Sequence, residues 1–159
     1  LWDKNKLKSQ IEFMRQNGCL FSYTNYTPFY LVNNKKIFKK TIIPRSAYDL
    51  NSFVKDTSIA TSSMIIKRKT INLKKFKRNS HNEDYDFKCK VLLENTIANK
   101  LEENLTFYRI TQNSRSSHKF KSILSIYSTN RNLLKMSFLK NIISIFFIAF
   151  NSIKKYGYK

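Results

Sequence analysis

The chain has 159 residues, about one domain's worth, and its 30 Lys and Arg against 10 Asp and Glu give a formal net charge of +20. This positive charge favours nucleic acid, anionic lipid or a phosphorylated substrate as a partner. A biased base composition of the coding sequence would also produce a similar excess of basic residues. Its two glycines exclude a glycine-rich phosphate loop from this sequence, and the spacing of Cys19 and Cys89 suggests neither a zinc site nor a disulfide framework. A reducing, cytoplasmic compartment fits this cysteine usage best.

The first predicted elements are a helix and then a strand, the order typical of an α/β fold. Residues 5–18 predict an amphipathic helix that ends at Asn17-Gly18, because apolar residues recur at helical spacing at Leu7, Ile11 and Met14. Residues 19–26 alternate two sets of side chains and are rich in β formers, which predicts a strand. A helix followed directly by a strand indicates an α/β protein.

The next stretch contains turn and cap signals. Residues 27–45 carry two short apolar runs around residues 33–36, which predicts a hairpin. Residues 46–56 predict a short helix with Ser46 as its N-cap, and residues 58–69 predict a buried strand of small and branched side chains. Residues 67–78 contain no acid and predict an exposed basic loop.

Three carboxylates then gather at the start of a predicted helix, at Glu83, Asp84 and Asp86, with Asn82 as its N-cap. One acid would be enough to complement the helix dipole. The cluster of three therefore supports a functional site that uses a carboxylate at least as well as it supports helix capping. We expect Asp84 to act as a general base, Glu83 to be its partner or an acceptor contact, and Asp86 to be a surface or capping group. The apolar face of this helix is predicted at Phe87, Val91, Leu92 and Leu93.

The last part of the chain is predicted to contain a strand, residues 104–110, and then two helices, residues 118–136 and 137–159. The run IISIFFIAF has nine residues, well under the roughly 20 needed to span a bilayer. Two interpretations remain open for the last helix. It lies in a membrane interface with its cationic flanks on anionic lipid, or it is buried against the domain or a partner.

Four segments in order resemble bacterial family 2 glycosyltransferases. Residues 1–26, LWDKNKLKSQIEFMRQNGCLFSYTNY, resemble the part after the metal-binding Asp-x-Asp, where DDLW precedes a helix and an FSYT strand. SIATSSMIIKRK is similar to that family's IGTSTVMIKR strand and NEDYDFKCKVLLE to its EDWDLWLRLL helix. ENLTFYRITQNSRSS is similar to ENLAYYRIHKNSLSS.

The resemblance implies an incomplete GT-A sheet flanked by helices, with a helical C-terminal tail. It implies transfer of a sugar from a nucleotide-sugar donor to an acceptor hydroxyl in the synthesis of surface polysaccharide or glycolipid. Asp84 matches the family's catalytic base and Glu83 its motif partner. The other residues that the resemblance assigns to substrate binding are Trp2, Thr61, Ser62, Arg109, Ser114 and Ser116.

The same resemblance implies that the nucleotide-binding half precedes Leu1. The ligands of Mg²⁺ or Mn²⁺ would lie in that half, so we expect this chain to bind no metal and to be inactive alone. We assign residues 1–115 to the acceptor-side part of the domain and residues 116–159 to C-terminal helices with a peripheral membrane role. The expected partners are a nucleotide-sugar donor, a saccharide or lipid-linked acceptor and an anionic membrane, and the expected location is the cytoplasm, at the inner face of the plasma membrane.

Two other functions fit parts of the sequence. A basic nucleic-acid-binding module would use residues 67–78 with Phe76 interleaved, although no helix-turn-helix, zinc or RNA-recognition motif accompanies them. A peripheral membrane scaffold would be held by residues 138–155.

Overall fold

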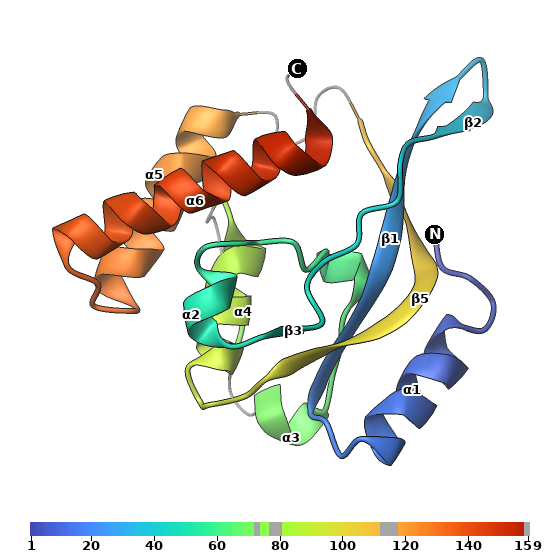
Figure 1. Ribbon diagram of the computed structural model, residues 1–159, viewed down its shortest axis with the longest axis horizontal. Helices are drawn as coiled ribbons and strands as arrows, with labels where there is room; N and C mark the ends of the chain where they lie inside the picture. The colour runs from blue at the N-terminus through green and yellow to red at the C-terminus, as the bar shows by residue number, and fades with distance from the viewer. Residues whose placement is uncertain (72–73, 77–80, 112–117, 158–159) are drawn as a thin grey trace. The chain divides into compact units, whose positions relative to one another are not determined.

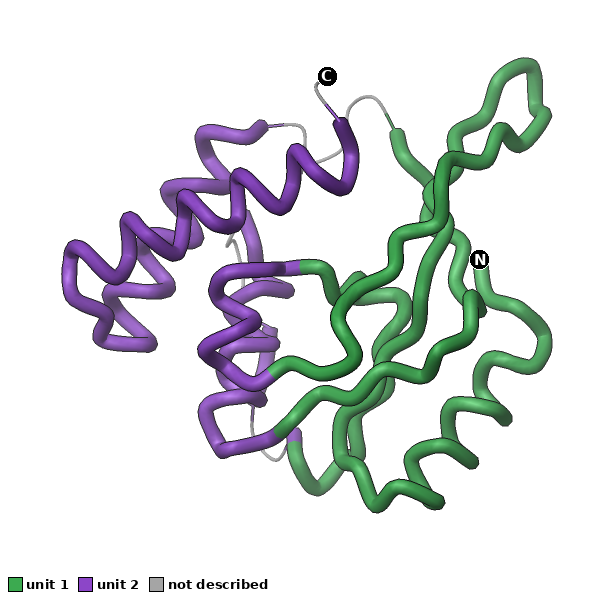
Figure 2. The backbone as a smooth tube through the Cα atoms, viewed as in Figure 1, with its two compact units in different colours: residues 1–48, 58–70, 97–114 green, residues 49–57, 71–96, 115–159 purple. Residues whose placement is uncertain are grey.

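The computed structural model describes residues 1–71, 74–76, 81–111 and 118–157. These residues form two compact units, each made of three segments that alternate along the chain (Figure 2). Unit 1 comprises residues 1–48, 58–70 and 97–114, and unit 2 comprises residues 49–57, 71–96 and 115–159. The mixed sheet, the helices and the C-terminal helix confirm the predicted α/β class (Figure 1).

Unit 1 is built on a mixed sheet with the strand order β2-β1-β5-β3. Its two long strands, β1 (Phe21–Val32) and β5 (Ala98–Arg109), run parallel, and Figure 1 shows them side by side. The short strands β2 (Lys35–Phe38) and β4 (Ile65–Ile66) pair antiparallel with β1, and β3 (Ala47–Tyr48) pairs antiparallel with β5. Strand β1 is therefore paired on both edges.

This central position explains a difference from the sequence pattern. The predicted strand at residues 19–26 exists, but it extends to Val32, and every residue from Phe21 to Phe29 is buried. The alternation of the sequence therefore does not separate an inner from an outer face. The hairpin prediction is confirmed, because Asn33 and Asn34 adopt φ values of 48° and 61° between β1 and β2. Such left-handed angles at two successive residues are typical of a tight hairpin turn.

Helix α1 (Lys6–Gln16) forms where predicted and ends at Asn17, followed by Gly18 with φ 62°. Of its predicted apolar face, Met14 is buried and Ile11 is half-buried, but Leu7 is wrong because it is 53% exposed, while Lys6 and Gln10 are fully buried. Side-chain hydrogen bonding decides this orientation. The Gln10 amide donates to Ser22 Oγ (2.9 Å) and to the Ser63 carbonyl (3.1 Å), and thereby fixes the helix on β1.

Three shorter elements also differ from prediction. The helix expected at residues 46–56 begins later, as α2 (Leu50–Phe53), because Asp49 accepts from Ser52 N at 2.8 Å in a capping box, and residues 47–48 form β3 instead. The strand expected at residues 58–69 contracts to a 3₁₀ turn, η1 (Thr61–Ser63), and β4. The turn forms because both the amide and the hydroxyl of Ser63 donate to the Ala60 carbonyl. Helix α3 (Arg68–Ile71) occupies part of the expected loop.

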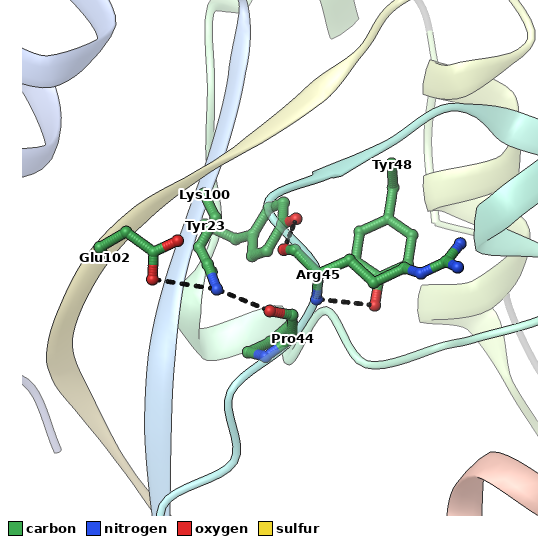
Figure 3. Close-up of polar contacts among 6 residues, drawn as sticks. All are labelled: Tyr23, Pro44, Arg45, Tyr48, Lys100 and Glu102. Atoms are coloured by element: carbon green, nitrogen blue, oxygen red, sulfur yellow. Dashed lines mark hydrogen bonds and ion pairs between the residues drawn. The ribbon is translucent and has the colours of Figure 1, made fainter.

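The segment before β3 is held on the sheet by buried polar side chains (Figure 3). Lys100 of β5 donates to the Pro44 carbonyl at 2.7 Å and pairs with Glu102 at 3.0 Å. The Tyr23 hydroxyl donates to the Arg45 carbonyl at 2.6 Å. These contacts satisfy carbonyl groups of residues 44 and 45 that pair with no strand in the described part of the sheet.

Unit 2 contains α2, α4 (Glu83–Leu92), α5 (Lys119–Asn132) and α6 (Phe138–Tyr156). The three long helices confirm the predicted ones. Phe53 of α2 stacks on Tyr85 of α4 with ring centroids 5.6 Å apart, and the Tyr85 hydroxyl donates to Asn130 of α5 at 2.7 Å. Among the predicted apolar positions of α4, Leu93 is wrong because it is 43% exposed. In the described ranges, none of the helices has the length and apolar character that crossing a membrane requires.

Candidate active site

The candidate site of unit 2 lies at the first turn of α4, where Glu83, Asp84 and Asp86 are found as predicted. Asn82 occupies the N-cap position but makes no side-chain cap bond. Its amide donates instead to the Ser122 carbonyl of α5 at 2.7 Å. The start of α4 is thus tied to α5, and the three carboxylates provide the negative charge that the helix dipole favours there.

Asp84 has the geometry that a general base needs. Its Oδ2 lies 3.0 Å from Nζ of Lys88, one turn later, and 46% of its side chain is exposed while that of Lys88 is 3% exposed. The hydrogen bond from the buried Lys88 holds the carboxylate in one orientation, as a general base requires.

The same carboxylate borders a small pocket. The pocket has a volume of about 120 Å³ and belongs to unit 2 alone, lined by Phe53, Thr57, Asn82, Asp84, Tyr85, Lys88 and Ile126. An acceptor hydroxyl at this opening would meet one fixed carboxylate against an aromatic wall. The geometry can therefore support proton abstraction from an alcohol.

Asp86 does not match its predicted role as a surface or capping group. Its side chain is only 7% exposed and pairs with Lys90 at 2.6 Å. At residue 86 the helix turns toward the interior of unit 2, so the charge requires a partner there. Asp86 is therefore a structural ion-pair residue, while Glu83 is half-buried beside Asp84.

Two other titratable groups of α4, Cys89 and Tyr85, do not act as bases near neutral pH. Burial raises the pKa of the Cys89 thiol to about 12, and it also raises the pKa of the Tyr85 phenol. Both groups are therefore protonated near neutral pH, and neither competes with Asp84 as a base.

Unit 1 brings together three of the residues predicted to bind substrate. The Trp2 indole Nε1 donates to the Ser62 carbonyl at 2.7 Å, and Thr61 precedes Ser62 in η1. Trp2 is 56% exposed, and Nζ of Lys6 lies 4.3 Å from its ring centroid. An exposed ring that is held by a hydrogen bond and a cation–π contact can serve as a stacking surface.

Arg109 is exposed at the end of β5, whereas Ser114 and Ser116 lie outside the described residues. Glu83 and Asp84 belong to unit 2, and Trp2, Thr61, Ser62 and Arg109 belong to unit 1.

Sequence reasoning missed two lysines, Lys88 and Lys6. Lys88 follows Asp84 by one helical turn, so its spacing was a usable signal. Lys6 is buried and donates to Gln10 Oε1 at 2.8 Å, and burial lowers its pKa to about 8. The burial of Lys6 cannot be read from the sequence, because the pattern does not distinguish it from the exposed Lys4 and Lys8.

The described residues also bear on two other kinds of site, a metal site and a nucleic-acid site. In those ranges no three His, Cys, Asp or Glu side chains form a group that could hold a metal ion. In the basic run, Phe76 stacks on Phe87 with centroids 4.2 Å apart, and Lys74 pairs with Glu94 at 2.5 Å. These contacts occupy an aromatic and a cation that a nucleic-acid site would use, while Lys77 and Arg78 lie outside the described residues.

Comparison with curated proteins finds similar bacterial glycosyltransferases. The UDP-Glc:alpha-D-GlcNAc-diphosphoundecaprenol beta-1,3-glucosyltransferase WfgD of Escherichia coli is 32% identical over 77% of this chain. The enzyme WfaP of Escherichia coli, which has the same activity in its name, is 29% identical over 98% of the chain. An uncharacterized glycosyltransferase of Haemophilus influenzae is 27% identical over 96% of it.

The chain spans about half the length of these relatives: 47% of WfgD, 59% of WfaP and 60% of the Haemophilus influenzae protein. No protein-family model matches the chain. No solved structure matches it either. The chain is thus similar along most of its length to parts of bacterial glycosyltransferases, and α4 with Asp84 lies within a fold of the expected α/β class.

Proposed function

We propose that this chain is the acceptor-side part of a family 2 glycosyltransferase of GT-A fold, which transfers a sugar from a nucleotide-sugar donor to an acceptor hydroxyl. The observation that carries the proposal is the partly exposed carboxylate of Asp84, held by a buried Lys88 at the edge of a pocket. The similarity to bacterial glycosyltransferases supports it independently.

In the proposed mechanism, the acceptor hydroxyl enters the pocket and donates its proton to Asp84 as its oxygen attacks the anomeric carbon of the donor sugar. The bond from that carbon to the nucleoside diphosphate breaks, and the diphosphate leaves with the bonding electrons. Lys88 orients the base during this step. In unit 1, Trp2 provides a stacking surface for a sugar or base ring, with Thr61 and Ser62 beside it.

The relatives suggest the substrate class. WfgD and WfaP are named for a UDP-glucose donor and an acceptor linked to diphosphoundecaprenol. We infer for this chain a nucleotide-sugar donor and a saccharide or lipid-linked acceptor in polysaccharide or glycolipid synthesis, at the cytoplasmic side of the membrane.

We further propose that the nucleotide-binding half, with the Asp-x-Asp ligands of Mg²⁺ or Mn²⁺, is encoded before Leu1. The metal would neutralise the charge of the leaving diphosphate when bound. The metal ligands of the proposed enzyme would then lie in that half, and we expect the chain alone to be inactive.

The coding sequence before Leu1 provides the first test. An in-frame Asp-x-Asp directly before Leu1 supports the proposal, whereas a stop codon at that place contradicts it.

The second test is enzymatic and uses the full-length protein. Asp84→Asn should lower kcat about 10²- to 10⁴-fold for transfer from a panel of nucleotide sugars, because the amide cannot accept the proton. Glu103→Gln is the matched control, since Glu103 is an exposed acid of β5. Circular dichroism of both variants checks the fold, and equal activity of the Asp84→Asn and control proteins would refute the assignment of the base.

A further inference from the structure

Helix α6 packs on the rest of unit 2 with its polar side. Asn141 and Ser144 are fully buried, and the same side of the helix continues to Asn151 and Lys155. Ser144 Oγ donates to the Val54 carbonyl at 2.6 Å, and the Asn151 amide donates to the Lys55 carbonyl at 3.0 Å. Lys155 pairs with Asp56 at 3.1 Å. These bonds fix the rotation of α6 about its own axis.

The opposite side of α6 is apolar and exposed. Leu139 is 71% exposed and Phe146 is 66% exposed, and every member of this side is more than 40% exposed. The residues recur at helical spacing along the whole element, and we call them the α6 apolar face: Leu139, Ile142, Ile143, Phe146, Phe150 and Ile153. The orientation is the reverse of a normal surface helix, which turns its apolar stripe to the core.

The charges of α5 and α6 favour an anionic partner for the α6 apolar face. Residues 104–159 contain no Asp or Glu. The exposed cations of α5, α6 and the turn between them are Lys119, Lys121, Arg131, Lys135, Lys140 and Lys154. By helical spacing, Lys140 and Lys154 border the apolar face itself. A second copy of the chain would bring the same cations against each other, whereas an anionic lipid surface attracts them.

We propose that α6 docks the protein on an anionic membrane surface, with the α6 apolar face at the acyl boundary and Lys140 and Lys154 at the level of the lipid phosphates. The helix lies in the plane of the interface, as is usual for amphipathic helices with a cationic border. This inference goes beyond the proposed transfer reaction and does not depend on it. It excludes burial of the α6 apolar face inside unit 2.

The first experiment measures sedimentation of the chain with phosphatidylcholine vesicles that contain or lack phosphatidylglycerol. We expect binding to the anionic vesicles, and the double variant Phe146→Asn/Phe150→Asn should weaken it by about tenfold or more, because two aromatic rings leave the interface. The matched control is Phe38→Asn/Ile43→Asn in unit 1, where both side chains are also more than half exposed. The control should bind within about twofold of the wild type.

The second experiment separates the charge from the apolar contribution. Lys140→Gln/Lys154→Gln should lower affinity for anionic vesicles by about 25-fold, because each cation near the surface contributes roughly a fivefold factor. Lys35→Gln/Lys36→Gln in the β1–β2 hairpin removes two exposed lysines elsewhere and should leave binding unchanged within about twofold.

Two results would overturn the proposal. One is equal vesicle binding by the aromatic double variant and its control while both remain folded by circular dichroism. The other is an absence of vesicle binding together with a dimer in analytical ultracentrifugation that Phe146→Asn/Phe150→Asn dissociates. Neither measurement requires transferase activity. Results that overturn the membrane proposal would therefore not affect the proposed function, which is tested separately.

Discussion

Helices α1 and α6 both turn polar side chains inward, but they differ in what they leave outside. Helix α1 buries Lys6 and Gln10 against unit 1 and exposes mostly charged and polar residues, with Leu7 among them. Helix α6 buries Asn141 and Ser144 against unit 2 and exposes a continuous apolar face. A polar inner side therefore does not imply a polar outer side: the outer side of α1 is mostly polar, whereas the outer side of α6 is apolar and exposed.

Among the changes made at α1 and α6, the largest effect is expected from the polar network that holds α6. Asn130 accepts from the Tyr85 hydroxyl and donates to Asn141 at 2.9 Å and to Ser144 at 3.2 Å. Asn130→Ala should lower the free energy of unfolding by about 3 kcal/mol, because several buried polar atoms lose a partner at once. Urea unfolding measures this, and Asn132→Ala on the exposed side of α5 should change it by less than about 0.5 kcal/mol.

The corresponding change in α1 should cost somewhat less. Gln10→Met removes the two hydrogen bonds to Ser22 and Ser63 and leaves Lys6 without its amide acceptor, so we expect a loss of about 2 kcal/mol in urea. Gln16→Met, at an exposed position of the same helix, is the control. If the two variants were equally stable, hydrogen bonding by Gln10 would not be what orients α1.

The buried Lys6 should give stability a distinct pH dependence. Burial lowers its pKa from 10.5 to about 8, so between these values the unfolded chain holds a proton that the folded chain has released. The penalty of burying the ammonium is therefore full below about pH 8, and this contribution to stability rises with pH up to 10.5, at most about 1.4 kcal/mol per pH unit. Unfolding of Lys6→Met should lack this rise, whereas Lys8→Met, at an exposed site of α1, should keep it.

The smallest effect is expected on the outer side of α6. Phe146→Asn should change the free energy of unfolding in the absence of lipid by less than about 0.5 kcal/mol, because Phe146 is 66% exposed. Phe53→Ala in the core of unit 2 is the contrast and should cost about 3 kcal/mol or more, since Phe53 is 1% exposed. A large loss in Phe146→Asn would mean that this face is already covered within the protein.

The sequence predicted the long elements because their signals are local. The helix end at Asn17-Gly18, the Asn33-Asn34 turn and the acidic start of α4 are each set by neighbouring residues. The sequence did not predict features that depend on a contact with a residue distant in sequence. Gln10 is turned inward by Ser22 and Ser63, and neither contact can be read from the helix pattern.

The same limit applies to the candidate site. Asp84 was identified from its cluster and its resemblance, and its pairing with Lys88 could have been read from the spacing of one turn. The burial of Asp86 depends on how α4 packs in unit 2, which no local pattern encodes. The contact of Trp2 with Ser62 joins residues 60 positions apart, so the sequence could suggest both residues but not their proximity.

The parallel pairing of β1 with β5 has a consequence for synthesis of the protein. The ribosome makes Phe21–Val32 well before Ala98–Arg109, an interval of roughly 4 to 15 s at about 5 to 20 residues per second. Throughout that interval one edge of β1, whose residues Phe21 to Phe29 are buried in the folded protein, lacks its native neighbour. The nascent chain is then most vulnerable to aggregation, and chaperones that shield β strands should matter most for its yield.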